Sequence, residues 1–270
     1  MKHWLLVVLI SIIACKGYGQ YTNGVTGLLH MPNAEMQKDG TFMIGGNYLD
    51  VHNVPSPPRW DNNFTYNYYV NITFFSIVEV AYVCTLFRAC HNGTLPESYW
   101  GRFTNQDRHF AFRLCLIKEG QLWKYMPAIV AGVSDPVTQA QHDGYYYGSV
   151  DESGNGYFNR WYIAVTKHFD FNGLGELGIH ATYLYNRRKD YPLNSPAFGL
   201  NFRPSLHRNL NVIAEYDAKT INVGATYSLW ADHFNLLFEL QKGRYISAGF
   251  VYKVNLLGGN NWTAKLLDYE

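Results

Sequence analysis

Hydrophobic and polar residues alternate with a period of two from Thr41 almost to the C-terminus, and no segment keeps a helical period over three turns. This pattern predicts an all-β chain of about twelve strands, most with the roughly 9 to 11 residues of a tilted membrane strand. The predicted strands are Thr41–His52, Phe64–Phe74, Val78–Phe87, Arg108–Ile117, Met126–Ser134, Trp161–Phe169, Glu176–Tyr185, Ala197–Arg203, Leu210–Asp217, Asn222–Leu229, Phe234–Leu240 and Tyr245–Val254.

The alternation separates an apolar face from a polar face in most of these strands. In Arg108–Ile117, for example, Phe112 and Leu114 share one face and Arg113 lies on the other. We expect the polar faces to line the interior of a barrel and to offer contacts to a translocated solute. Pairing between lumen charges is the alternative explanation, because buried charges need partners. The candidate lumen residues are Glu79, Arg113, His180, Glu215, Asp217 and Glu239.

A soluble β-sandwich or lipocalin-like barrel also alternates, but it turns its apolar face inward. Three features favour a transmembrane antiparallel up-and-down barrel in a bacterial outer membrane. They are a secretion signal, aromatic residues at strand ends such as Trp161, Tyr185 and Trp230, and an even number of strands joined by short and long connections. The short turns span 73–78 and 217–222, and the long connections span 89–107 and 136–159. We therefore predict one barrel domain over residues 20–256 and a C-terminal tail over 257–270.

Residues 1–19 have the pattern of a signal peptide, with Lys2 and His3 followed by an apolar run from Trp4 to Ile13. The run is roughly half of the ~20 residues that a membrane-spanning helix needs. Cleavage after Gly19 competes with a lipobox-like site that would leave Cys15 lipidated. We favour the first, because isoleucine is a weaker first lipobox residue than leucine.

The composition narrows the possible functions. Aromatic residues make up 17% of the chain, which suits the aromatic girdles of a membrane barrel. The net charge of +1 with only 16% charged residues gives no electrostatic footprint for nucleic acid. No spacing resembles a zinc site and no G-x-S-x-G element is present, so we expect no metal, no cofactor and no catalytic residue.

The cysteines give no clear disulfide. The strand phases place Cys84 and Cys115 on opposite faces, which makes a bridge between them doubtful. A small loop closed by Cys84 and Cys90 and isolated apolar thiols both stay open.

Residues Thr26 to Gly46 read TGLLHMPNAEMQKDGTFMIGG, a Gly-Leu-Leu-x-x-Pro turn that runs through Asp39-Gly40 into a strand. We expect Asp39-Gly40 to form the turn that introduces the first strand. Pro32 should rigidify the preceding loop, and Gly27 should supply a positive φ. We expect these four residues to have structural roles rather than to contact a ligand.

This stretch resembles the N-terminal motif of the YjbH family of outer-membrane exopolysaccharide proteins. Three later blocks resemble the family in the same order and cover most of the mature chain. They are Asp107–Leu114 with Lys118–Gly120 and Tyr125–Ala128, then Tyr157–Asn159 with Thr166–Phe169, and finally Phe198–Pro204 with Ala214–Asp217.

The resemblance implies a non-enzymatic outer-membrane barrel that assists secretion or anchoring of exopolysaccharide or capsule. Its implied partners are outer-membrane lipid, polysaccharide and other export-machinery proteins. A general porin or structural barrel without polysaccharide specificity is the main alternative. A barrel lipid hydrolase that uses His180 or Ser247 is a third possibility.

Overall fold

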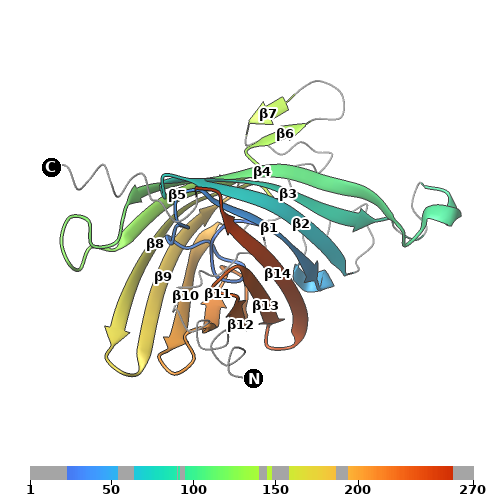
Figure 1. Cartoon of the computed structure of the whole chain (residues 1–270). Coiled ribbons are helices and arrows are strands. Elements are labelled where there is room, and N and C mark those ends of the chain that lie inside the picture. Colours follow the sequence, from blue (N-terminus) through green and yellow to red (C-terminus); the bar gives the residue numbers. More distant parts are fainter. Residues whose placement is uncertain are drawn as a thin grey trace.

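A computed structural model describes residues 23–53, 64–89, 91, 95–139, 145–147, 158–186 and 194–257. Within these residues, twelve strands close into one antiparallel barrel in which neighbours along the chain pair, and β1 (Thr41–Leu49) joins β2 (Thr65–Phe74) to β14 (Tyr245–Asn255) (Figure 1). The predicted fold class is therefore confirmed. The other barrel strands are β3 (Val78–Arg88), β4 (Phe103–Ile117), β5 (Ala128–Ser134), β8 (Arg160–Phe171), β9 (Gly175–Tyr185), β10 (Ser195–Pro204), β11 (Leu210–Tyr216), β12 (Ile221–Leu229) and β13 (Phe234–Gln241).

Four short elements of the described chain lie outside the twelve strands of the barrel. β6 (Val137–Gln139) and β7 (Tyr145–Tyr147) pair into a small hairpin that stands off from the barrel in Figure 1. Val51–Asn53 and Glu97–Tyr99 form single 3₁₀ turns. Among the described residues, no helix is long and apolar enough to cross a membrane.

The strand boundaries differ from the predicted ones where the chain leaves the alternating pattern. β1 ends at Leu49 rather than His52, because Val51–Asn53 forms a 3₁₀ turn. β4 begins five residues earlier than predicted, at Phe103, since its pairing with β3 continues past a bulge at Phe87/Arg88. The β6–β7 hairpin lies in the span 136–159, where the sequence predicts a long connection.

The apolar faces of the strands point outward. On β4, Phe112 is 40% and Leu114 is 45% exposed, whereas Arg113 between them is 1% exposed. Trp161 and Tyr185 are also exposed, as are most of the large hydrophobic residues on the same phase. An apolar exterior around a closed barrel is the arrangement that lipid requires, and it excludes the soluble sandwich.

The two ends of the barrel differ. Short turns at 75–77, 172–174, 205–209 and 230–233 lie at the end where β1 begins, which we call the short-turn end. The three longest connections, at 50–64, 89–102 and 135–159, lie at the opposite end, together with the short turns at 217–220 and 242–244. One longer connection, 118–127 between β4 and β5, lies at the short-turn end. Outer-membrane barrels keep their short turns in the periplasm, so the short-turn end is the periplasmic end.

Candidate functional site

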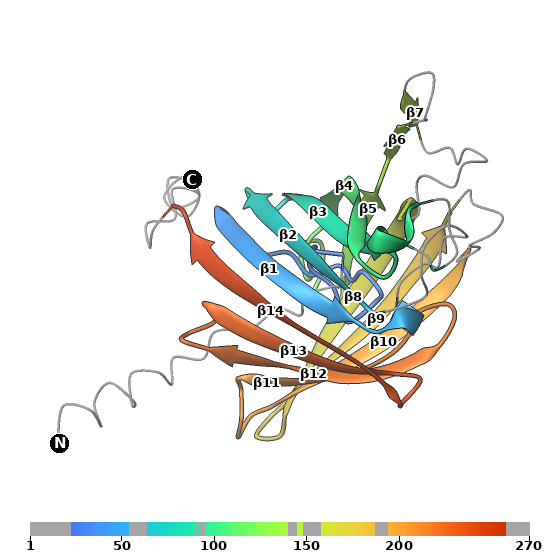
Figure 2. The ribbon, with the colours of Figure 1, turned by 90° about the vertical axis from the view of Figure 1, so that its right-hand side faces the viewer.

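The N-terminal segment does more than introduce β1. Residues 24–38, which we call the plug, lie inside the barrel, and Figure 2 shows this blue segment enclosed by the strands. The Gly24 carbonyl accepts a hydrogen bond from Asn71, three residues before the end of β2, and Gly40 N–H donates to the Thr73 carbonyl. Both ends of the plug therefore lie near the short-turn end, and its middle reaches across the lumen.

The middle of the plug is a tight turn that holds a carboxylate of the barrel wall. Gly27 and Pro32 form an antiparallel bridge, and Leu28 N–H donates to the Met31 carbonyl at 3.0 Å. The Glu215 carboxylate on β11 accepts the backbone N–H groups of Leu29, His30 and Met31, at 3.0, 2.6 and 3.3 Å. Successive N–H groups that converge in this way form an anion-binding concavity, so the Gly-Leu-Leu-x-x-Pro turn is shaped to hold Glu215.

A second wall site holds both arms of the plug. Glu79 on β3 and Arg113 on β4 form an ion pair with an N–O distance of 2.5 Å, and both side chains are fully buried. Glu79 accepts the Thr26 N–H at 2.7 Å, and Arg113 donates to the Asn33 and Glu35 carbonyls at 2.6 and 2.9 Å. Buried charges are tolerated when their remaining hydrogen-bonding capacity is used, and here plug backbone uses it.

The third contact is a charged cluster at the short-turn end. Glu35 of the plug pairs with Arg203 on β10 at 3.2 Å and with His168 on β8 at 2.9 Å. His168 also contacts Glu119 in the β4–β5 turn at 2.6 Å, and Arg203 contacts Glu176 on β9 at 2.8 Å. Burial alone would raise the pKa of the Glu35 carboxyl, but Arg203 and His168 hold that pKa well below its usual range.

His30 supplies a fourth contact, because its Nε2 lies 2.6 Å from a carboxylate oxygen of Glu239 on β13. Burial would lower the pKa of the His30 imidazole, but Glu239, together with the charges of Glu215 and Asp217, raises it from 6.5 to about 9. Protonated His30 therefore stabilises the plugged barrel in full below pH 6.5. That stabilisation is lost as the pH rises through about 9.

We expect the free energy of unfolding of the detergent-solubilised barrel to fall by up to roughly 3 kcal/mol between pH 6.5 and about 9, through the loss of the His30 charge. Urea unfolding, followed by heat-modifiable migration on gels, measures it. His30→Gln should flatten this dependence, whereas His207→Gln in an exposed turn should keep it. An equal pH dependence in both variants would rule out His30 as its source.

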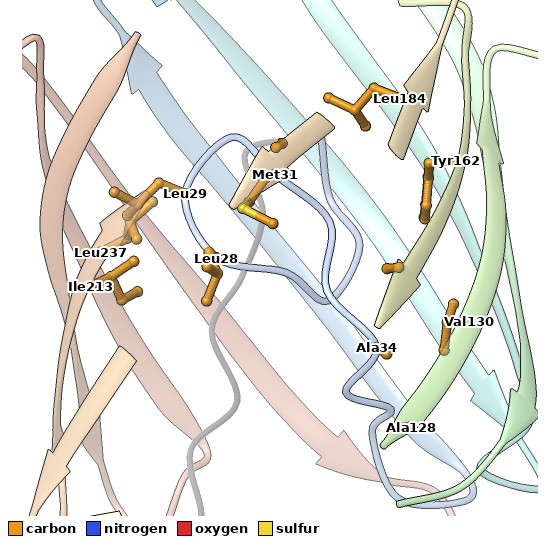
Figure 3. Packing of buried hydrophobic residues seen from close by; sticks show 12 residues of the cluster. Leu28, Leu29, Met31, Ala34, Ala128, Val130, Tyr162, Leu184, Ile213 and Leu237 are labelled. Atoms are coloured by element: carbon orange, nitrogen blue, oxygen red, sulfur yellow. The ribbon is translucent and has the colours of Figure 1, made fainter. Parts of the chain in front are cut away.

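Apolar packing against the barrel wall also holds the plug in place (Figure 3). Leu28, Leu29, Met31 and Ala34 pack against inward-facing wall residues, namely Ala128, Val130, Tyr162, Ala164, Leu184, Ala197, Ile213 and Leu237. Burying one such leucine contributes roughly 1.5–3 kcal/mol. A Cβ on Gly199 would come within 2.2 Å of Leu28 Cδ1, and one on Gly224 within 2.9 Å of Leu29 Cδ2, so both glycines leave room for the plug.

Gly199→Trp is expected to displace Leu28 and Met31 from the barrel wall, since added volume in a packed core costs roughly 1–3 kcal/mol. Leu200→Trp adds the same ring one residue further, where the side chain is 48% exposed on the outside of the barrel. Bilayer recordings should therefore show more open time for Gly199→Trp than for Leu200→Trp. Equal closed fractions in the two variants would mean that Leu28 is not held against Gly199.

The structure places all six predicted polar residues on the inward side or at its rim, and each is less than 9% exposed. Glu79, Arg113, Glu215 and Glu239 contact the plug directly. His180 contacts Thr166 at 2.9 Å and Asn201 at 2.7 Å, and Thr166 in turn accepts the Ala34 N–H. Asp217 instead accepts the N–H groups of Lys219 and Thr220, so it stabilises the β11–β12 turn.

The four residues of the N-terminal motif have distinct positions. Asp39 and Gly40 form the turn before β1, where Gly40 has a φ of +70° and Asp39 accepts the Phe75 N–H. The Pro32 carbonyl accepts the Thr182 hydroxyl at 2.7 Å. The expectation of a positive φ at Gly27 was wrong, because Gly27 pairs with Pro32 as a β-bridge, and Gly24 has the positive φ instead.

Other predictions concern cysteines, metals and enzymes. Cys84 and Cys115 are free thiols. Cys15, Cys90, the signal peptide and all of the predicted tail except Leu257 lie outside the described residues. Across the described ranges, no group of three or more His, Cys, Asp or Glu side chains could hold a metal ion. Both ring nitrogens of His180 contact Thr166 and Asn201, which leaves neither nitrogen facing a serine nucleophile.

The sequence also contains plug contacts that we did not predict. Glu35 belongs to the plug itself. The wall residues that bind the plug are Thr166, His168, Thr182 and Arg203. His168 and Arg203 lie inside blocks that resemble the family, and that position was the available signal. Glu35 lies within the N-terminal motif, but nothing in its neighbours identified its distant partners.

A closed twelve-strand barrel with an apolar exterior and a plugged lumen defines an outer-membrane β-barrel, whose outer face contacts lipid. Residues 19–189 match the YjbH family, described as "Exopolysaccharide biosynthesis protein YbjH", and the chain belongs to this family. No curated protein matches the chain. Among solved structures, an outer membrane channel from Pseudomonas putida F1 is similar at 11% identity, covering 84% of this chain and 100% of that chain, with a TM-score of 0.41.

The blocks that resemble the family meet at the plug. Arg113, Glu119 and His168 come from blocks within the matched residues, and each binds the plug or supports a residue that does. Arg203 and Glu215 come from the two parts of the last block, beyond residue 189, and both bind the plug directly. The N-terminal motif and its companions in the sequence are therefore the two sides of one interface.

Proposed function

We propose that this protein is a non-enzymatic outer-membrane barrel that assists secretion or anchoring of exopolysaccharide or capsule, and that its plug is a removable closure of the lumen. The observation that carries the proposal is the interface between the N-terminal motif and wall residues from the other blocks. Membership of an exopolysaccharide family supports the substrate class.

The mechanism is passive. With the plug displaced, the inner wall would offer amide, hydroxyl and carboxylate groups to sugar hydroxyls, and no covalent bond would be made or broken. Neighbouring strands already align amides on the inner face, as in the Asn47–Asn67 contact at 2.8 Å and the Asn201–Asn211 contact at 2.7 Å. Release of the plug toward the periplasm needs no threading of the described segment, because both of its ends lie near the short-turn end.

A general porin without polysaccharide specificity is the competing function. A permanently open porin needs a water-filled lumen, whereas residues 24–38 occupy this one. The plugged lumen therefore favours a closed barrel that opens on demand.

A deletion strain tests the proposed role. We expect it to lose surface or released polysaccharide, and plasmid-borne wild-type protein should restore it. Arg113→Ala, which loses two plug contacts and the partner of Glu79, should alter polysaccharide release while the barrel still folds and migrates heat-modifiably. Unchanged polysaccharide in the deletion strain would refute the secretion role.

A further inference from the structure

A cavity of about 320 Å³ lies at the short-turn end, between the plug and the barrel wall. The plug contributes Glu35, Met36 and Gln37, and the wall contributes Thr166, His168 and Arg203. The volume is at the lower end of the roughly 300–1,000 Å³ that small-molecule pockets span. The cavity therefore has room for one small ligand, and it faces the compartment from which an exported molecule arrives.

The charges of the lining nearly cancel. Three carboxylates face three permanent cations, namely Glu35, Glu119 and Glu176 on one side and Lys38, Lys118 and Arg203 on the other. Arg203 pairs with Glu35 and Glu176, the second at 2.8 Å, whereas Glu119 pairs with His168, a further lining residue, and with Lys167. A charged ligand would meet like charge on part of the wall. An uncharged ligand that both donates and accepts hydrogen bonds suits this lining best.

Ala34, Ala128 and Cys115 add small apolar surface to the lining beside the polar groups. A sugar ring presents hydroxyls at its edge and C–H groups on its faces, so it matches a wall of this mixed kind. Carboxylate acceptors and a guanidinium donor are strong hydrogen-bond partners for hydroxyls.

We propose that this cavity binds a neutral saccharide of one or two rings, as the first contact between an exported polysaccharide and the barrel. This inference rests on the proposed function and adds the location and charge of the substrate unit. Because Glu35 belongs to the plug and Arg203 to the wall, a bound sugar would compete for the contact that holds them together.

The test uses full-length protein in a detergent without a sugar headgroup, with maltose and cellobiose as neutral probes and glucuronic acid as the charged one. Ligand-observed NMR should detect binding of a neutral disaccharide. Ala128→Phe, which fills the cavity, should weaken that binding by about tenfold or more. Ile129→Phe, one residue further on the opposite face of β5, should leave it unchanged.

Glu119→Gln provides a second variant in a turn outside the barrel wall, so that misfolding of Ala128→Phe does not decide the outcome. It should also weaken disaccharide binding about tenfold, as expected for loss of one charged hydrogen bond. Absence of neutral disaccharide binding, tighter binding of glucuronic acid, or unchanged binding in both variants would overturn the proposal. If the deletion strain still lacks polysaccharide, such a result removes only the saccharide site and leaves the secretion role standing.

Discussion

Deleting residues 24–37 should convert a barrel that conducts little current into one that forms stable open pores. The plug fills the lumen of twelve strands with apolar packing and backbone hydrogen bonds, and its removal leaves an inner wall rich in polar groups that water can enter. Twelve strands enclose a wider interior than the eight that side chains alone can fill. Planar-bilayer recordings of the purified proteins measure the effect.

The barrel itself should survive this deletion. Its strands stay hydrogen-bonded around a closed ring, Glu79 and Arg113 stay paired with each other, and the Asp39–Gly40 turn is retained. Heat-modifiable migration checks that the deletion variant folds. A folded variant that conducts no more than the wild type would show that the plug is not what closes the lumen.

Glu215→Ala should release the plug without any deletion. Three backbone N–H groups lose their acceptor, and each buried unsatisfied group costs roughly 1–3 kcal/mol. Leaving the barrel lets these groups bind water, so the plug should dissociate rather than stay unsatisfied. The expected result is a large rise in open time, approaching that of the deletion variant.

Two further variants serve as controls for Glu215→Ala. Glu215→Gln keeps the shape of the side chain and one acceptor oxygen, so it should open the barrel less often than Glu215→Ala. Asp217→Ala removes a nearby buried carboxylate that accepts the N–H groups of Lys219 and Thr220 and the Asn222 amide, so it should lower stability while the plug stays in place. Equal opening by Asp217→Ala and Glu215→Ala would point to general loosening and not to plug release.

The strands were predictable because their period is short and each strand carries its own pattern. Phe112, Arg113 and Leu114 are enough to orient β4 once the apolar side is known to face lipid. The β6–β7 hairpin escaped prediction because three-residue strands are too short to show a period. The end of β1 and the start of β4 were misplaced, since a 3₁₀ turn and a bulge interrupt alternation locally.

The plug could not be placed from sequence because its contacts are long-range. Leu29 and Glu215 are 186 residues apart, and no local pattern links a loop to a particular strand. One signal did exist: Ile213 and Leu237 interrupt the polar faces of β11 and β13. An apolar residue pointing into a polar lumen needs an apolar partner, and Leu28, Leu29 and Met31 supply that surface.

The inward position of Glu79, Arg113 and Glu215 followed from strand phase, but their partners did not. Strand phase alone allows either contact with a solute or charge pairing across the lumen. Glu79 and Arg113 do pair, but as neighbours on adjacent strands, and Glu215 binds backbone N–H groups of the plug. Phase fixes the side of the sheet on which a residue lies, whereas its partner depends on what fills the enclosed space.

Thiol labelling of the plug tests most directly that the N-terminal segment lies inside the barrel. In a variant whose native cysteines are replaced by alanine, Ala34→Cys puts a thiol at a position 2% exposed, and Lys38→Cys puts one at an exposed position of the same segment. In folded outer-membrane preparations, a maleimide should label Lys38→Cys readily and Ala34→Cys only after heat unfolding. Equal labelling of the two in the folded barrel would contradict the plugged lumen.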